Sequence, residues 1–398
     1  MRPKVEGKSK VLLITSFFSS PYHCNRAPYN ELLFKELCQH YQIEIIRPIA
    51  FTDIYKSTKK LNKKEYLHGE WQGIKIHYPT FYYIPKYARR CLGYFYWLAV
   101  VRLVEQLEYI PDVFYTTWAY PDAYATMLLA RKYKRDFILR VHGSDINVLL
   151  EVNSLTKRII TVLNAAAIIL SPSEKLKEKM VNIGVDRRKI HVIYSGVDKK
   201  LFKKLDKSYC IEHLKLNKNA KRILFIGNLK VEKGVYDLLF AISLMAVQKK
   251  TEIELLYIGD GPERQKLLNS IYRQGLTKFV RLMGPVAHSD LPCWINSSDV
   301  VVLPSYSEGV PNVILEAMAC GTNVVTTNVG GIPEVVTCSE KLIDPGDIKS
   351  LANNLEKALY DITYQTKRKI PILSYGDIAL RVRDEIISPL LREVKKVL

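Results

Sequence analysis

Short runs of β-branched and other apolar residues alternate with longer segments of helical apolar spacing through most of the chain. This alternation is typical of parallel β-sheets whose strands are connected by crossover helices. In the first half we expect strands at residues 11–15, 43–49, 74–78, 113–117, 137–141, 167–171 and 191–195. A second series is expected at residues 222–227, 253–259, 279–284, 300–304 and 323–327. The pattern therefore predicts two consecutive doubly wound α/β sheets.

A chain of 398 residues suits two domains of roughly 150 to 200 residues, each with its own core. Between the two strand series, residues 196–221 are polar and rich in lysine, with no convincing strand. We therefore expect an N-terminal domain at residues 1–200 and a C-terminal domain at residues 201–375. Residues 376–398 are expected to form a helix that packs back toward the N-terminal domain.

Cysteine usage and hydropathy argue against several classes of protein. The seven cysteines form no C-x-x-C pair and no close Cys/His cluster, which favours a reducing cytosol over a disulfide framework or a structural zinc site. The apolar run at residues 11–14 is too short for a signal peptide. The longest strongly apolar stretch, residues 91–101, falls well short of the ~20 residues that a membrane-spanning helix needs.

The formal net charge is +19 at pH 7, and the excess of lysine and arginine lies in the first 300 residues. Such a charge attracts polyanions, which include nucleic acid, an anionic membrane surface and phosphorylated substrates. The chain has no zinc-finger spacing, no aromatic ribonucleoprotein motif and no basic zipper. We therefore expect no nucleic-acid partner.

Two glutamates, Glu308 and Glu316, stand eight positions apart in the segment PSYSEGVPNVILEAMACG, residues 304–321. On one continuous helix they would be separated by ~12 Å and by roughly 80° around the axis, too far to act on one bond together. Pro311 suits the first turn of a helix, and the apolar residues that follow it have helical spacing. We therefore place Glu308 in a strand-to-helix loop and Glu316 on the helix that follows.

The N–H groups of residues 309–313 would then lie at a helix N-terminus, where bound phosphate is favoured. An ionised carboxylate only accepts hydrogen bonds, so each glutamate can hold vicinal hydroxyls of a sugar ring or a ribose. The spacing fits a nucleotide sugar that bends around its diphosphate. The alternative is a helix-start carboxylate favoured by the helix dipole, together with an unrelated surface glutamate.

The stretch LPSYSEGVPNVILEAMACGTNVVTTNVGGIPEVV resembles the nucleotide-binding segment of retaining glycosyltransferases of family 4, the group 1 transferases, whose hallmark is an E-x7-E pattern. The resemblance includes RVHGSDIN, IGNLKVEKGVYDLLFAI and YIGDGPERQKLL, and it covers residues 110–350 well. It implies the GT-B fold, in which two Rossmann-like domains face a cleft, the first binding the acceptor and the second the donor. Transferases of the teichuronic-acid, capsule or exopolysaccharide type are the subgroup that the chain resembles most.

The resemblance implies retaining transfer of a hexose-type sugar from a nucleotide-diphosphate sugar to a hydroxyl of a lipid-linked or cell-surface polysaccharide. No cofactor or metal is implied, because no Asp-x-Asp pair follows a strand. The residues that match the family's catalytic positions are His142, Lys233 and Glu308. Those that match its substrate-binding positions are Gly227, Asn228, Gly259, Gly261, Gly284, Gly309, Val310, Pro311, Asn312, Val313 and Glu316.

Each role has a structural alternative. Lys233 is expected to meet the donor diphosphate as a compact charge, and the alternative is a solvated surface lysine. His142 heads HGSD after strand 137–141, which suits positioning or electrostatics beside the reacting sugar, although a lone histidine after a strand is usually structural. Glu308 is expected to face the transferred sugar and Glu316 the ribose.

Two features depart from the family pattern. Asn228 stands where the family commonly has an arginine after the strand-end glycine. Residues 16–33 contain no glycine, whereas family members usually have a glycine-rich turn after the first strand. These departures keep two other classes open, a nucleotide-sugar epimerase on the same fold and an inactive membrane-docking binding subunit.

Residues 59–103 interleave lysines and arginines with many aromatic side chains. Basic residues attract anionic lipid headgroups, and Tyr and Trp settle at the membrane interface, so the segment predicts a monotopic docking surface near the acceptor site. The alternative is a buried helix of the first domain with a solvated basic loop. We expect a cytoplasmic protein that associates peripherally with the inner face of the membrane.

Overall fold

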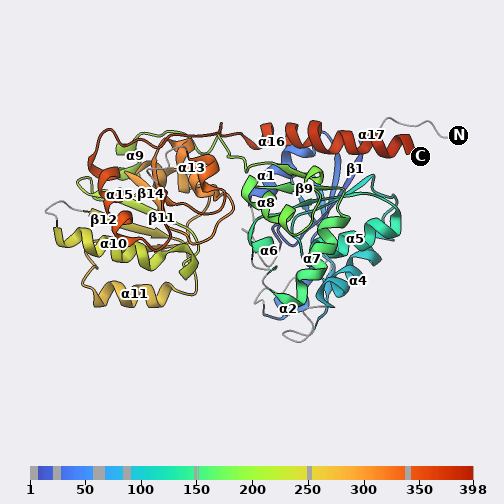
Figure 1. Ribbon diagram of the computed structural model, residues 1–398, viewed down its shortest axis with the longest axis horizontal. Helices are drawn as coiled ribbons and strands as arrows, with labels where there is room; N and C mark the ends of the chain where they lie inside the picture. Colours follow the sequence, from blue (N-terminus) through green and yellow to red (C-terminus); the bar gives the residue numbers. More distant parts are fainter. Residues whose placement is uncertain are drawn as a thin grey trace. The chain divides into compact units, whose positions relative to one another are not determined.

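The computed structural model describes residues 8–20, 28–56, 68–83, 91–147, 150, 152–248, 253–336 and 342–397 (Figure 1). The chain divides into two compact units. Unit 1 comprises Met1–Ser195 together with Tyr375–Leu398, and unit 2 comprises Gly196–Ser374. The first division falls five residues before the predicted boundary at residue 200, because Gly196 and Val197 already belong to unit 2, where Val197 bridges to Ser374. The second falls one residue before the predicted boundary at residue 375.

Unit 1 is built on a twisted eight-stranded sheet in the order β10-β9-β8-β7-β1-β2-β5-β4. All neighbouring strands are parallel except β4 and β5, which form an antiparallel pair. The strands are β1 (Lys10–Ile14), β2 (Gln42–Ile46), β4 (His68–Trp71), β5 (Ile74–His77), β7 (Val113–Thr116), β8 (Phe137–Arg140), β9 (Ile168–Ser171) and β10 (Ile190–Val192). A short separate pair joins β3 (Ile49–Ala50) to β6 (Thr80–Phe81).

Helices lie on both faces of this sheet (Figure 1), so every residue of the central strands β7 and β8 is buried. They are α1 (Pro28–Leu37), α2 (Phe51–Lys56), α4 (Leu92–Val104), α5 (Asp122–Tyr133), α6 (Ser144–Asn147), α7 (Asn153–Ala165) and α8 (Glu174–Asn182). The sheet order reverses between β1 and β7, and this is the point where doubly wound sheets bind ligands beyond the carboxyl ends of their strands.

The end of the chain belongs to unit 1. Helix α16 (Tyr375–Arg381) packs against α1, and a π-helical segment (Val382–Ile387) leads from it into α17 (Ser388–Val397). Tyr41 Oη lies 3.0 Å from Ser388 Oγ, and Arg383 Nη1 lies 3.5 Å from His40 Nδ1. The chain therefore leaves unit 1, forms unit 2 and returns to unit 1.

Unit 2 contains a six-stranded, fully parallel sheet in the order β13-β12-β11-β14-β15-β16. Its strands are β11 (Lys221–Ile226), β12 (Ile253–Ile258), β13 (Val280–Gly284), β14 (Val300–Leu303), β15 (Asn323–Thr327) and β16 (Leu342–Ile343). Its helices are α9 (Lys207–His213), α10 (Val235–Gln248), α11 (Arg264–Arg273), α12 (Leu291–Asn296), α13 (Asn312–Cys320), α14 (Ile332–Val335) and α15 (Ile348–Tyr360). This is the Rossmann strand order, and its reversal lies between β11 and β14.

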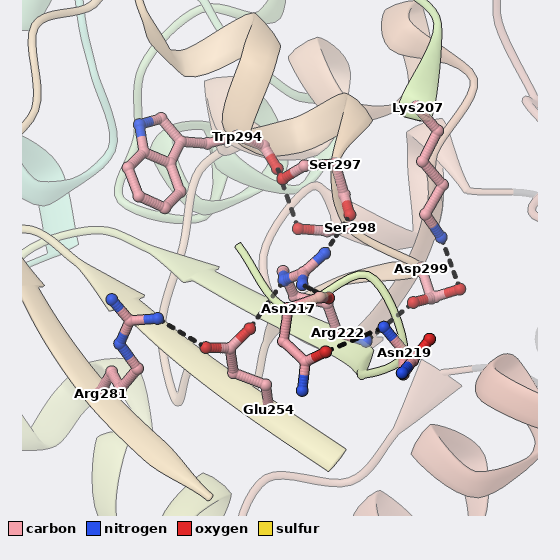
Figure 2. A network of polar contacts seen from close by, with 10 residues as sticks. All are labelled: Lys207, Asn217, Asn219, Arg222, Glu254, Arg281, Trp294, Ser297, Ser298 and Asp299. Carbon is pink, nitrogen blue, oxygen red and sulfur yellow. Dashed lines mark hydrogen bonds and ion pairs between the residues drawn. The ribbon is translucent and has the colours of Figure 1, made fainter. Parts of the chain in front are cut away.

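A buried ion network ties together the amino ends of the unit 2 strands (Figure 2). Arg222, with no exposed surface, donates from Nε to Glu254 Oε2 at 2.9 Å and from Nη1 to the Ser297 carbonyl at 2.8 Å. Arg281 Nη1 donates to the other oxygen of Glu254 at 2.8 Å. The Arg222 N–H donates to Asp299 at 2.7 Å, so the network aligns β11, β12, β13 and β14.

The predicted α/β class with two doubly wound sheets is confirmed, and a strand lies at every predicted position. The sequence pattern missed β3, β6 and β16, which are only two residues long and show no period, and β4, whose sequence HGEW has no alternating apolar pattern. None of the helices in the described ranges is long and apolar enough to cross a membrane.

Candidate active site

The candidate site of unit 2 lies where the sheet order reverses, at the carboxyl ends of β11 and β14. Lys233 ends a 3-10 turn that follows β11, and its Nζ lies 2.5 Å from Glu308 Oε1. Ser305 Oγ, two residues beyond β14, donates to the same carboxylate oxygen at 2.7 Å. The Glu308 side chain is only 9% exposed, whereas that of Lys233 is 29% exposed. The structure therefore brings two of the three predicted catalytic residues into direct contact.

Close packing between two loops sets this contact. Gly234 has a φ of +67°, and a Cβ there would lie 2.0 Å from the Pro304 carbonyl oxygen, so only glycine fits. The Tyr306 N–H donates to the Glu232 carbonyl at 2.9 Å. Lys233 is thus held against the loop that carries Glu308.

The loop of Gly309 and Val310 leads into α13, which begins at Asn312. Pro311 is the N-cap residue with an extended ψ of 126°, which corrects the prediction that it lies inside the first turn. The N–H groups of Asn312 and Val313 remain in the first turn of the helix, where no carbonyl four residues earlier in the helix can accept from them. A helix N-terminus therefore follows Glu308 as predicted.

A second glycine turn supports this loop and was absent from the predicted site. A Cβ on Gly330, which has a φ of +55°, would lie 1.9 Å from the Glu308 carbonyl oxygen. The neighbouring Gly331 N–H donates to the Gly309 carbonyl at 2.7 Å. The paired glycines of NVGGIPEVV were the available signal, because adjacent glycines indicate a close backbone approach.

Glu316 lies on α13 and is 8% exposed. Its Oε1 lies 2.9 Å from Nε2 of His288, which stands in the loop between β13 and α12. Sequence reasoning missed His288, and its only signal was that it follows the strand-end residue Gly284. The two glutamates therefore have separate partners, Lys233 for Glu308 and His288 for Glu316.

The predicted glycines line the carboxyl ends of three neighbouring strands. The Gly227 N–H donates to the Ile258 carbonyl at 3.0 Å, and the Gly259 N–H donates to the Gly284 carbonyl at 2.9 Å. A Cβ on Gly259 would lie 2.0 Å from the Gly227 carbonyl oxygen, and a Cβ on Gly261 would lie 2.4 Å from Asn228 Oδ1. Asn228 itself is exposed, so its position can face solvent or a ligand.

His142 belongs to unit 1, two residues beyond β8. Its Nε2 is enclosed and has no hydrogen-bond partner among the described residues. Ring centroids of Tyr29, Phe17 and Trp118 lie 5.3, 6.1 and 6.1 Å from that of the imidazole. Burial, with a smaller contribution from the charge of Arg140, lowers the pKa of His142 to about 3, so the ring is neutral near pH 7.

Asp145 holds the loop that carries His142. Its Oδ1 accepts from the N–H groups of His142 and Gly143 at 2.9 Å each, and its Oδ2 accepts from the Ala119 N–H at 3.2 Å. Burial raises the pKa of Asp145 to about 6, although these backbone donors act in the opposite direction. The carboxylate thereby joins the loops after β7 and β8.

Phe17 stands in the glycine-poor loop after β1. Its ring stacks on Trp118, which follows β7, with centroids 4.2 Å apart and an interplanar angle of 25°. In the same two loops, Thr15 Oγ1 and Thr117 Oγ1 lie 2.5 Å apart. An aromatic stack therefore occupies the switch point of unit 1, where the family resemblance had implied a glycine-rich turn.

Parts of the proposed docking segment, residues 59–67 and 84–90, lie outside the described residues. In its described part, α4 packs against α5 and buries Tyr96, Val100 and Val104. Tyr82 and Tyr94 are exposed, at 69% and 49%. In the portions of the chain that the structure describes, no group of three or more His, Cys, Asp or Glu side chains could hold a metal ion.

Two family models match the chain, one in each half. The model described as Glycosyltransferase Family 4 matches residues 31–201, and the model described as Glycosyl transferases group 1 matches residues 220–361. The chain is 26% identical over 364 residues to TuaC of Bacillus subtilis, and the match covers 87% of this chain and 88% of TuaC. TuaC is named as a putative glycosyltransferase of teichuronic acid biosynthesis. N-acetyl-α-D-glucosaminyl L-malate synthase of Bacillus anthracis is 26% identical over 256 residues, or 63% of this chain and 66% of that enzyme.

Solved structures share the fold at low sequence identity. A sucrose-phosphate synthase from Thermosynechococcus elongatus has a TM-score of 0.72 at 18% identity, covering 98% of both chains. HepE of Anabaena, solved in complex with UDP-glucose, has a TM-score of 0.65 at 19% identity, again covering 98% of both chains.

Proposed function

We propose that this chain, which belongs to the group 1 glycosyltransferases of family 4 and has their GT-B fold, transfers a hexose-type sugar from a nucleotide-diphosphate sugar. The acceptor is a hydroxyl of a lipid-linked or cell-surface polysaccharide, and the configuration of the anomeric carbon is retained. The observation that carries the proposal is the cluster of Lys233, Glu308 and the N-terminus of α13, with Glu316 on the same helix.

The cluster has the groups that a nucleotide sugar requires. The first-turn N–H groups of α13 and the Lys233 ammonium would receive the diphosphate oxygens. Lys233 carries three donors, so it can keep its contact with Glu308 while it binds phosphate. Glu308 would then accept from hydroxyls of the transferred sugar and Glu316 from those of the ribose.

Catalysis would arise from positioning and from stabilisation of the departing diphosphate. Negative charge develops on the leaving phosphate in the transition state, and preorganised donors at that place lower the barrier. A glycosidase needs two carboxyl groups that flank one bond at ~5 to 9.5 Å. Here Glu308 already contacts Lys233 and Glu316 already contacts His288, which favours a binding role for both glutamates. Neutral His142 would contribute as a positioning group and not as a charged acid.

A melting-shift panel of UDP, GDP and their sugars tests the donor assignment. We expect one base family to stabilise the protein, by about 2.7 kcal/mol when the ligand is at 100 times its Kd. Glu316→Ala should remove most of this shift, while Glu212→Ala, at an exposed position of α9, should not. Glu316→Ala with unchanged donor binding and turnover would contradict the proposal, and no shift with any nucleotide would favour an inactive subunit.

The acceptor class and the membrane location rest on different observations. The net charge of +19 is concentrated in the first 300 residues, and Tyr82 and Tyr94 expose their rings on unit 1. TuaC, by name, acts in teichuronic acid biosynthesis. We therefore propose that the protein works in the cytoplasm at the inner face of the membrane, docked through unit 1.

Sedimentation with vesicles tests the docking proposal. Binding to phosphatidylglycerol vesicles should fall as salt rises, because screening weakens attraction between exposed charges. Phosphatidylcholine vesicles should bind little protein. Equal sedimentation with both lipids, or with neither, would contradict docking through the basic surface.

Incubation with donor alone separates transfer from epimerisation, since only an epimerase would release an altered sugar without an acceptor.

A further inference from the structure

The contact between His288 and Glu316 joins a loop and a helix of unit 2 that are distant in the sequence. His288 follows β13, and Glu316 lies in the second turn of α13. The distance from Nε2 to Oε1 is 2.9 Å, and the exposed fractions of the two side chains are 34% and 11%. A carboxylate buried to this extent is costly without a hydrogen-bond partner. Among the described residues, His288 is the donor that meets this need.

The chemistry of the pair determines the position of its proton. An ionised carboxylate only accepts hydrogen bonds, so Nε2 of His288 must carry the hydrogen that lies between them. The carboxylate has about four lone-pair sites on its two oxygens. The structure gives Oε2 of Glu316 no hydrogen-bond partner in the described ranges, so this oxygen keeps its capacity to accept from a ligand.

The imidazole is itself held in place. The ring of Phe202 packs against it with centroids 5.1 Å apart and an interplanar angle of 59°. Phe202 is only 1% exposed, and its N–H donates to the Asp198 carbonyl at 2.7 Å. A side chain whose neighbours fix its rotamer can in turn fix a second side chain. Phe202 therefore holds the ring of His288 in place, and His288 in turn holds the carboxylate of Glu316.

We propose that His288 is a positioning residue for recognition of the donor ribose. It donates from Nε2 to Oε1 of Glu316 and thereby presents Oε2 to the vicinal hydroxyls of the ribose. This inference rests on the proposed function, because it assumes that Glu316 binds the ribose. It adds that the protein's preference for a ribose over a deoxygenated sugar depends on a residue from the β13–α12 loop.

The test compares two ligands across five proteins. The ligands are the nucleoside diphosphate that stabilises the wild-type protein, UDP or GDP, and its 2′,3′-dideoxy analogue. The proteins are wild type, His288→Ala, His288→Gln and Glu316→Ala, with Ser289→Ala as a matched control, since Ser289 is exposed in the same loop. The measured quantity is the ratio of the two Kd values, supported by KM and kcat for the donor.

Wild type should bind the ribose form at least tenfold more tightly than the dideoxy form, and Glu316→Ala should bring this ratio close to one. His288→Ala should also lower the ratio several-fold and raise KM for the donor with little change in kcat. His288→Gln, whose amide can donate, should restore part of the ratio, and Ser289→Ala should leave it unchanged. A merely structural role for His288 would weaken both ligands equally.

The outcomes separate the two proposals. If Glu316→Ala keeps the wild-type ratio, or if wild type binds neither nucleotide, the ribose assignment fails and this inference fails with it. If Glu316→Ala removes the ratio but His288→Ala retains it, the proposed function stands and the role of His288 is overturned.

Discussion

Lys233→Met removes the ammonium group that lies 2.5 Å from Glu308 Oε1 and keeps an unbranched side chain that is one atom shorter. The Glu308 carboxylate, 9% exposed, would retain Ser305 Oγ as its donor among the described residues. Removing one partner of a fully buried ion pair costs about 3–5 kcal/mol. Because the Lys233 side chain is 29% exposed, water offsets part of this loss, and we expect a decrease of about 1–3 kcal/mol in the free energy of unfolding.

The same substitution should also slow turnover. The departing diphosphate would lose a fixed cation, and the loss of one preorganised donor typically lowers kcat by about 10²–10³. In the double variant Lys233→Met/Glu308→Gln no charge is left without its partner, so stability should return toward that of wild type. Turnover should not return, since the double variant still lacks the cation.

Two assays separate these effects. Urea unfolding followed by circular dichroism gives the free energy of unfolding, and release of nucleoside diphosphate from the donor gives turnover. Lys233→Arg is the control that keeps the charge. A Lys233→Met variant as stable and as active as wild type would refute the reasoning. Recovery of turnover in the variant Lys233→Met/Glu308→Gln would also refute it.

Two further predictions concern stability away from the phosphate-binding loops. Arg222→Met should lower the stability of unit 2 by about 3–5 kcal/mol in urea unfolding. Among the described residues, Glu254 would keep the half-exposed Arg281 as its one charged partner. A nucleotide melting shift that changed as well would contradict the placement of this network at the opposite end of the strands. Wild type should lose more stability than a protein without this imidazole as the pH falls from 6.5 toward about 3, because His142 binds a proton only when unfolded in that range. Asp145, whose pKa is raised to about 6, acts in the opposite direction in both proteins. His142→Phe should show a shallower loss over the same range in unfolding experiments, and an identical slope would refute the low pKa.

Much of the fold could be read from periodicity. Buried strands such as β12 and β14 appear as uninterrupted apolar runs because both faces of a parallel sheet are covered. The boundaries were less well determined. The polar segment after residue 196 has no strand pattern, and its assignment to unit 2 depends on contacts such as that of Val197 with Ser374.

The candidate site was predicted in part. Glu308, the helix start after it and Glu316 lie within one segment of the chain, so local pattern was sufficient to place them relative to one another. His288 and Gly330 were missed because their roles depend on neighbours that are distant in the sequence. His288 contacts Glu316 from the loop between β13 and α12, and Gly330 is required by the position of the Glu308 carbonyl oxygen. The family pattern also could not reveal that Phe17 stacks on Trp118.

By itself, the sequence determined that unit 2 is a doubly wound sheet and that one loop and one helix of it carry two carboxylates beside a helix N-terminus. Only the tertiary structure decided which groups those carboxylates meet. Strands β11 and β14 are adjacent in the sheet although β12 and β13 separate them in the chain, and this adjacency brings Lys233 to Glu308. The physical reason is that spacing encodes the direction of a side chain within its own element, whereas the order of strands is set by burial of the whole sheet.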